Sequence, residues 1–264
     1  MSLKFTCGAD PELFLADATG RLRASCGLIG GTKAQPQPLT QLGKGYAVQE
    51  DNVAIEFNIP PASNAKEFQE SIKKTLDLLT SGVKSMYDFH IVNLSAASFP
   101  KEELESPGAK EFGCDPDFNA WTGKKNPKPK AEDETLRSCG GHVHVGYAKG
   151  SMEERKLIKC MDLFLGVPSI LMDKGELRKQ LYGKAGAYRD KIYGAEYRTL
   201  SNFWVFDDRL TQWVWDNTER AVQAVESLFA VDEYRATILD AIDNNNKEAA
   251  GFLVNRFNLE VLSV

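Results

Sequence analysis

The first sixty residues alternate between hydrophobic and polar positions in the way that β-strands require. Short strand-like runs, separated by Gly, Thr-Gly and Asn turn signals, are LKFTCG, ELFLAD, RLRAS, YAVQ and VAIEFNI. The sequence ELFLADATGRLRAS predicts a hairpin that turns near residues 18–20. Further strands are predicted for FHIVNLSAAS, HVHVGY and EYRTLSNFW. We therefore expect a mainly antiparallel sheet, with residues 1–60 as its strand-rich part.

Helical periodicity replaces this alternation in three places. The first helix is predicted to start at a capping box of Asn64 and Glu67. Its apolar positions are Phe68, Ile72, Leu76, Leu79, Val83 and Met86. A second helix is predicted from Ser151, with Glu154 completing its capping box. The remaining part, residues 207–264, is predicted to be helical. Its first helix has apolar positions Leu210, Val214, Ala221, Val225 and Leu228.

The segment from residue 100 to 135 is polar and irregular, and it ends in GKKNPKPKAEDET. It is either a solvated surface loop or a lysine-bearing lid over an anionic ligand. We find no internal repeat and no linker that would divide the chain, so we expect one domain over residues 1–264. The expected fold class is α+β, with helices packed on one face of the sheet and the second face available for a binding site.

The predicted strands carry pairs of polar residues on one side, because side chains at i and i+2 project the same way. The pairs are Asp10 with Glu12, Glu56 with Asn58, His142 with His144, and Glu196 with Arg198. A solvated sheet face usually carries Lys, Thr and Ser, but this face has no lysine. Crowded carboxylates repel one another unless a cation lies between them. The pattern predicts a divalent-metal site, and carboxylates with a histidine favour Mg²⁺ or Mn²⁺ over Zn²⁺.

Composition argues against several classes of protein. The net charge of −5 argues against general nucleic-acid binding. No apolar run approaches the roughly 20 residues that span a bilayer, and the start does not resemble a signal peptide. The five cysteines are dispersed and form no CxxC, which indicates reduced thiols. Cys139, beside the histidine strand, is expected to be a core residue and not a nucleophile. We expect a cytoplasmic protein without membrane or nucleic-acid partners.

Several of these motifs resemble those of known enzymes. GADPELFLAD resembles the first metal strand of glutamine synthetases, GGHVHVG resembles their histidine strand, and EYR resembles their late Glu-x-Arg strand. VAIEFNIPPA is similar to the corresponding strand of glutamate–cysteine ligases, which share that fold. Over about residues 5–205, the chain resembles the small, largely phage-encoded carboxylate–amine ligases of this superfamily. Glutamine synthetases have an additional amino-terminal domain with no counterpart here, so the resemblance implies neither their ring-shaped oligomer nor glutamate as the substrate.

The resemblance implies a glutamine-synthetase-like catalytic domain with two divalent metals. Glu12 and Glu56 would hold the metal nearer the acyl phosphate. A second metal, which grips the nucleotide phosphates, would be held by Asp10, His142 and Glu196. That family has a further acidic ligand shortly before the position of Glu56. Asp51 is the candidate, but its place in the strand alternation does not match, and we do not include it.

The remaining site residues are implied to serve the nucleotide. His144 would face ATP or its transferred phosphoryl group, and Arg189 and Arg198 would neutralise phosphate charge. Lys184 lies with Arg189 in the basic loop GKAGAYRDK, which is either a phosphate-covering loop or an ordinary surface loop. Arg198 and Glu56 are expected to be the catalytic residues.

The implied activity is ATP-dependent formation of an amide or peptide bond through an acyl phosphate, with ATP and Mg²⁺ or Mn²⁺ as cofactors. The carboxylate and amine substrates, small molecules or peptides, are not indicated, and neither is the oligomeric state. An alternative is a zinc-dependent metallohydrolase that uses His142 and His144 to activate water. A third interpretation is a metal-stabilised binding module, in which Glu56→Gln would harm folding or binding and no turnover would exist.

Overall fold

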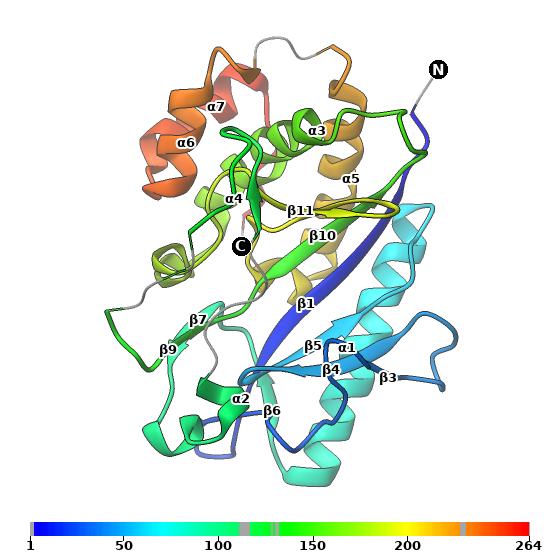
Figure 1. Cartoon of the computed structure of the whole chain (residues 1–264), viewed down its shortest axis with the longest axis vertical. Helices are drawn as coiled ribbons and strands as arrows, with labels where there is room; N and C mark the ends of the chain where they lie inside the picture. The colour runs from blue at the N-terminus through cyan, green and yellow to red at the C-terminus, as the bar shows by residue number, and fades with distance from the viewer. Residues whose placement is uncertain (1–2, 111–116, 128, 130–131, 228–230, 264) are drawn as a thin grey trace.

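A large antiparallel sheet forms the centre of the molecule (Figure 1). The computed structural model describes residues 3–110, 117–127, 129, 132–227 and 231–263. The strands of these residues are β1 (Thr6–Ala16), β2 (Leu22–Arg23), β3 (Gln37–Pro38), β4 (Ala47–Asp51), β5 (Ala54–Asn58), β6 (His90–Val92), β7 (Ala96–Ser98), β8 (Phe118–Asn119), β9 (Leu136–Ser138), β10 (Gly141–Gly146), β11 (Ala187–Lys191) and β12 (Gly194–Tyr197). The α-helices are α1 (Ala65–Tyr87), α2 (Pro107–Lys110), α3 (Glu154–Met161), α4 (Val167–Met172), α5 (Asp208–Ala224), α6 (Arg235–Asp243) and α7 (Lys247–Phe257).

The sheet has the strand order β3-β4-β5-β1-β10-β12-β11-β8, and β2 and β6 pair with the end of β1. Every pairing in it is antiparallel, as the sequence predicts. The strands β7 and β9 form a separate pair. The predicted hairpin is present between β1 and β2, where Gly20 adopts a φ of 84°.

The central strand β1 is longer than the sequence indicates, because the two predicted runs LKFTCG and ELFLAD join into one. Its first half pairs with β10 up to Pro11, and from Glu12 it pairs with β5. Pro11 has no amide hydrogen, which suits the point where the strand changes neighbours. The amide of Glu12 donates to the carbonyl of Gly140 at 2.9 Å. This single strand therefore brings β5 and β10 together.

The helices other than α2, which packs in a second cluster with Phe14, contribute to one core on a face of the sheet, as expected. The sheet residues that face them are fully buried and include Leu13, Ile55, Phe57, Val143, Val145 and Tyr197. They belong to one core whose members run from Cys7 to Leu259. Because side chains alternate, the neighbours of these apolar residues project to the other face. None of the described helices combines the length and apolar character needed to cross a membrane.

The helix starts were predicted with mixed success. Asn64 caps α1 by accepting the amide of Glu67 at 3.0 Å, although the Glu67 carboxylate accepts from Ser63 instead of Asn64. The predicted start at Ser151 is wrong, since α3 begins at Glu154 without a side-chain cap. Ser151 instead closes a turn, in which its hydroxyl donates to the carbonyl of Ala148 at 2.6 Å. The helical character of residues 207–264 is confirmed by α5, α6 and α7; Leu228 lies outside the described residues.

Two predicted strands end early. FHIVNLSAAS is divided into β6 and β7 by a turn in which the amide of Leu94 bonds the carbonyl of Val92. EYRTLSNFW leaves the sheet after Tyr197, and a 3-10 helix occupies Asn202–Phe206. Ser201 caps this short helix by accepting the amide of Phe203 at 3.2 Å. In the described part of residues 100–135, short helical turns and β8 occur within the predicted irregular segment.

Candidate active site

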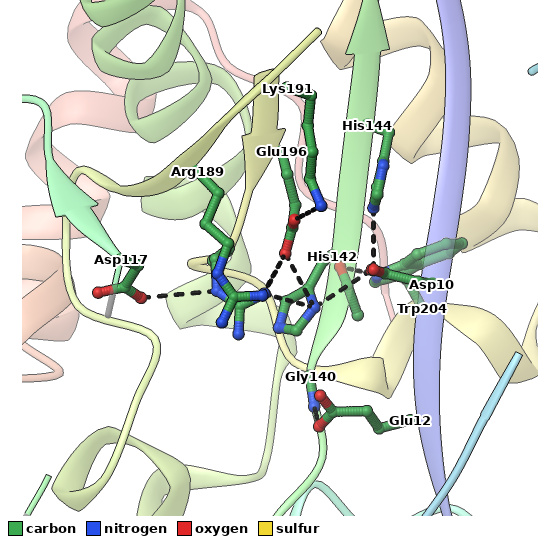
Figure 2. Close-up of polar contacts among 12 residues, drawn as sticks. Asp10, Glu12, Asp117, Gly140, His142, His144, Arg189, Lys191, Glu196 and Trp204 are labelled. Carbon is green, nitrogen blue, oxygen red and sulfur yellow. Dashed lines mark hydrogen bonds and ion pairs between the residues drawn. The ribbon is translucent and has the colours of Figure 1, made fainter. Parts of the chain in front are cut away.

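The polar side chains that the sequence places on one face do lie together, on the side of the sheet away from the helices (Figure 2). Directly opposed residues of antiparallel strands project to the same side. The opposed pairs are Asp10–His142, Glu12–Glu56, His144–Glu196 and Arg189–Glu196. Five strands, β1, β5, β10, β11 and β12, therefore contribute to one polar surface.

One group of potential metal ligands consists of Asp10, His144 and Glu196, each with a ligand atom within 4.8 Å of the others. Nε2 of His144 is 3.0 Å from Oδ2 of Asp10, and its Nδ1 contacts the hydroxyl of Tyr193. Glu196 is fully buried and forms an ion pair of 2.6 Å with Nζ of Lys191. The carboxylates of this group are thus already surrounded by nitrogen atoms.

A second group consists of Glu12, Asp51 and Glu56, again with ligand atoms within 4.8 Å of one another. Oε2 of Glu12 accepts the backbone amide of Gly140 at 2.6 Å. Three carboxylates at such distances offer the hard oxygen atoms that Mg²⁺ and Mn²⁺ prefer. The donor chemistry of both groups therefore fits the divalent cations that the sequence predicts.

The exclusion of Asp51 on strand alternation is wrong, and the reason is a tight turn. Asp51 ends β4 and pairs with Ala54 at the start of β5, so two turn residues separate the strands. Asn52 supports this turn with a φ of 55°. Alternation restarts at the turn, and Asp51 shares the face of Gln49, which lies opposite Glu56.

Arg198 lies between the charged groups. Its Nη1 forms an ion pair with Glu196 and is 3.3 Å from Nδ1 of His142. Its Nε is 3.5 Å from Oδ2 of Asp117, on the other side of the guanidinium. With only 5% of its surface exposed, Arg198 lines both the cleft and the small cavity described below. It is positioned to act on a group in either space.

The Gly-Gly pair before the histidine strand has a steric explanation. A Cβ on Gly140 would lie 2.2 Å from Nε2 of His142, and one on Gly141 would lie 2.3 Å from the carbonyl oxygen of Ser201. Trp204 Nε1 donates to the carbonyl of Gly141 at 3.2 Å. Only glycine permits these approaches, which set the position of His142 and of the amide that binds Glu12.

His142 lies beside the two residues that the resemblance pairs with it, since its Nδ1 is 3.2 Å from Oδ1 of Asp10 and 3.7 Å from Oε1 of Glu196. It belongs to neither three-residue group found among the described residues. Burial, with the nearby Arg198, lowers its pKa to about 4, so His142 is neutral at pH 7. A zinc site would need both imidazoles as ligands of one ion, and the groups found contain His144 alone.

The acids of the second group have raised pKa values. Burial, together with Asp51, raises the pKa of Glu12 to about 7. Burial and the carboxylates of Asp10, Glu12 and Asp51 raise the pKa of Glu56 well above its ordinary value. Negative charge is therefore under-compensated here, which is the electrostatic condition that a bound cation relieves.

The first group has the opposite balance. Burial acts to raise the pKa of Asp10, but His144 and His142 outweigh it and hold the pKa well below the ordinary range. For Glu196, burial and Asp10 act upward, but Arg198 and the two histidines lower the pKa to about 2. Burial acts to lower the pKa of His144, and Asp10 raises it overall. A metal at this group would replace the proton of His144, because a histidine ligand must be neutral.

Three spaces adjoin the two groups. An open cleft of about 250 Å³ includes Asp10, Glu56, His144 and Lys191 among its lining residues. A more apolar pocket of about 290 Å³ shares His144 with it and is lined by glycines and Tyr193. A smaller cavity of about 50 Å³ lies beside the second group and is lined by residues that include Glu12, Asp51, Arg137, Arg178 and Arg198. The cleft and the small cavity meet at Glu12, His142 and Arg198.

Lys184 is not brought to this face. Its Nζ donates to the carbonyl of Asp243 at 2.9 Å, where α6 ends, and the amide of Ala185 donates to the Asp243 carboxylate at 2.7 Å. Arg189 does reach the site, with Nη1 3.6 Å from Oε1 of Glu196. Lys191 and Lys33 both line the cleft, so the expectation of a face without lysine is wrong. Strand alternation from Arg189 would have identified Lys191.

Residues outside the predicted set also surround the site. Asp117 and Arg178 come from segments whose sequence shows no strand alternation, so no pattern pointed to them. Cys139 is fully buried and burial raises the pKa of its thiol well above the ordinary value, in agreement with the expected core role. Asn58 lines both the cleft and the apolar pocket.

Comparison with protein families gives one match. Residues 135–260 match the family described as Phage phiEco32-like COOH.NH2 ligase-type 2. The matched part contains β10 and β12, and with them His142, His144, Glu196 and Arg198. It supports a relationship to carboxylate–amine ligases and does not cover β1, β4 or β5.

Comparison with solved structures finds, among others, a bifunctional glutathione synthetase from Pasteurella multocida. The two chains are 11% identical, with a TM-score of 0.45, and the alignment covers 97% of this chain and 49% of that one. The chain thus spans about half the length of that structure. A comparison with curated protein sequences finds no match.

Proposed function

We propose that this protein is an ATP-dependent carboxylate–amine ligase that forms an amide or peptide bond through an acyl phosphate. The observation that carries the proposal is the pair of three-ligand groups on one sheet face, with Arg198 beside both. The match of residues 135–260 to a carboxylate–amine ligase family supports the same activity from sequence. The order of motifs along the antiparallel sheet is what a glutamine-synthetase-like catalytic domain would have.

Two divalent cations, Mg²⁺ or Mn²⁺, are proposed as cofactors. Glu12, Asp51 and Glu56 would hold one, and Asp10, His144 and Glu196 would hold the other. When bound, the cations would supply positive charge that offsets the phosphate oxygens of ATP.

The nucleotide would occupy the open cleft and the adjoining apolar pocket. Arg189 and Lys191 line the cleft and would contact its phosphate oxygens. The apolar pocket is lined by Gly8, Gly146 and Tyr193 and would receive the base. The two spaces share His144, which places the base next to the phosphates.

The acyl donor would present its carboxylate at the small cavity. A cavity of about 50 Å³ holds a few water-sized groups, which matches a carboxylate. The buried Arg178 would attract this carboxylate. Its NH groups bond the carbonyls of Arg198 and Thr199, which hold the guanidinium in place, and its Nε has no hydrogen-bond partner. Arg198 reaches this cavity and the cleft, so it can neutralise charge at the boundary between them.

The reaction follows from charge. A carboxylate repels nucleophiles and has no good leaving group. Its oxygen would attack the γ-phosphorus of ATP, ADP would leave, and the resulting acyl phosphate would be attacked by an amine with release of phosphate. Arg198 and Arg189 would stabilise the charge that develops on the transferred group, the effect from which such sites gain most of their rate.

The proposal is tested by screening pools of carboxylates and amines for ADP release in the presence of ATP and Mg²⁺, with the condensed product identified by mass spectrometry. We expect ADP release that requires Mg²⁺ and an acyl donor, and that is lost in Glu56→Gln. A product of hydrolysis without ATP would favour the metallohydrolase alternative. The absence of any turnover would favour the binding module.

A further inference from the structure

Asp117 lies at the edge of the site and belongs to neither ligand group. Its Oδ2 is 3.5 Å from Nε of Arg198, and its Oδ1 accepts from the side-chain amide of Asn126 at 2.9 Å. Figure 2 shows Asp117 and His142 on opposite sides of the arginine groups. The Asp117 side chain keeps 17% of its surface exposed, so a molecule from solvent can reach it.

The segment that carries Asp117 is firmly attached to the fold. The strand β8 follows Asp117 directly and pairs with β11. Nε1 of Trp121 donates to the buried carboxylate of Asp162 at 2.6 Å, and Arg155 Nε donates to the carbonyl of Ala120 at 2.9 Å. The amide of Asn126 also donates to the carbonyl of Asp117 at 2.9 Å. Asp117 is therefore anchored by the residues that follow it, as the position of a functional group requires.

The charges around the site identify what Asp117 can bind. An aliphatic amine arrives at neutral pH as an ammonium ion, and Arg189, Lys191 and Arg198 would repel it. Among the described residues, four acids line the cleft or the small cavity: Asp10, Glu12, Asp51 and Glu56. Two more, Glu196 and Asp117, form the ion pairs with Arg198 given above. The first five form the two ligand groups. Asp117 is not among the lining residues of either space but forms an ion pair with Arg198, which lines both, and it is the acid of this set that remains for an ammonium ion.

We infer that Asp117 binds the amine substrate as its ammonium ion and accepts a proton from it, an inference that rests on the proposed ligase function. The ammonium ion transfers one proton to the Asp117 carboxylate, and the freed nitrogen lone pair forms the C–N bond to the acyl phosphate carbon. The C–O bond to phosphate then breaks, and the second proton of the nitrogen leaves with the phosphate. Asn126 orients the carboxylate, and Arg198, which pairs with Asp117, also lines the cavity that receives the acyl group.

The test uses Asp117→Asn, which keeps the shape of the side chain and an oxygen that can accept from Asn126. Amide formation is measured with ammonium chloride and with a pool of primary amines, and hydroxamate formation is measured with hydroxylamine, which is uncharged at neutral pH. We expect the variant to lose about 100-fold in kcat/KM for the charged amines, while hydroxamate formation stays within about twofold of the wild type. The amide-forming rate of the variant should also rise with pH, since deprotonated amine becomes more abundant.

The matched control is Glu105→Gln, which removes an exposed acid of the same polar segment and should change neither rate. An equal loss of amide and hydroxamate in Asp117→Asn would overturn the inference and make Asp117 a residue that positions Arg198. Unchanged amide formation would also overturn it. If the wild type forms neither ADP nor hydroxamate with any acyl donor, the ligase proposal fails and this inference fails with it.

Discussion

At the scale of single residues, two lysines of the same loop region have separate roles. Lys191 forms an ion pair of 2.6 Å with Glu196 at the cleft, whereas Lys184 bonds the carbonyl of Asp243 at the end of α6. Lys191→Ala should weaken Mg²⁺–ATP binding about tenfold, the value of a charge-assisted contact, with little change in thermal stability. Lys184→Ala should lower the free energy of unfolding by about 1 kcal/mol and leave nucleotide affinity unchanged.

Nucleotide titration and thermal unfolding of both variants check this prediction. If Lys184→Ala weakened nucleotide binding and Lys191→Ala did not, the basic loop would serve the nucleotide as the sequence alone implied.

The residues that share one face of a strand could be predicted because alternation is a local property. Asp10 and Glu12, or Glu196 and Arg198, need only an extended backbone to share a side. Asp51 required knowledge of where one strand stops and the next begins. The Asp51-Asn52 dipeptide is itself a turn signal, and reading it as a hairpin turn would have restored Asp51 to the ligand set.

At the scale of elements, the approach of β10 to β1 depends on a residue without a side chain. Gly140→Ala would bring a Cβ to 2.2 Å from Nε2 of the buried His142, so the imidazole would have to move. Moving the ring would break its contacts with Asp10 and Arg198, so we expect a loss of about 1–3 kcal/mol in stability. We also expect a weaker response to Mg²⁺, because the amide of Gly140 orients Glu12.

The control is Gly251→Ala in α7, where a Cβ would have nothing within 4 Å. In a helix this exchange should be neutral or stabilising by roughly 0.5–1 kcal/mol. Chemical unfolding with and without Mg²⁺ measures both variants. Equal stability of Gly140→Ala and Gly251→Ala would show that the close approach is not a constraint.

The element boundaries that the sequence failed to predict are set by long-range contacts. EYRTLSNFW ends as a 3-10 helix because Asn202 donates to the carbonyl of Glu12 at 2.9 Å and Trp204 donates to that of Gly141. These partners are 190 and 63 positions away in the sequence. Local propensity contains no information about them, whereas the start of α1 depends on neighbours and was predicted at the residue.

At the scale of the whole molecule, the class of fold followed from the sequence but the strand order did not. Alternating runs predict an antiparallel sheet, and apolar stripes predict helices on one face. That β1 lies between β5 and β10, and so joins both ligand groups, depends on pairing between remote segments. Strand alternation predicted that these motifs share one face, and the register of β1 shows that they do.

Mg²⁺ and pH should act on the stability of the whole protein through the same carboxylates. The pKa of Glu12 is raised to about 7 by burial and Asp51, above the unfolded value of about 4.3. Between these values the folded state binds more protons than the unfolded state, so stability falls as pH rises through 7. Burial raises the pKa of Asp162, also to about 7, and that of Glu154, to about 8, so both contribute in the same direction.

The Mg²⁺-dependent part of stability therefore isolates the site. Without Mg²⁺ we expect a lower Tm at pH 8 than at pH 6.5, and saturating Mg²⁺ should raise Tm at pH 8 by several degrees, or roughly 1–3 kcal/mol. Glu56→Gln removes one of the repelling charges, so it should raise Tm at pH 8 without Mg²⁺ and abolish the Mg²⁺ response. Calorimetry over this pH range is decisive, because a destabilised Glu56→Gln would mean that Glu56 is needed for folding, as in a metal-stabilised binding module. A wild-type Tm that ignores Mg²⁺ at every pH would mean that the three carboxylates hold no cation.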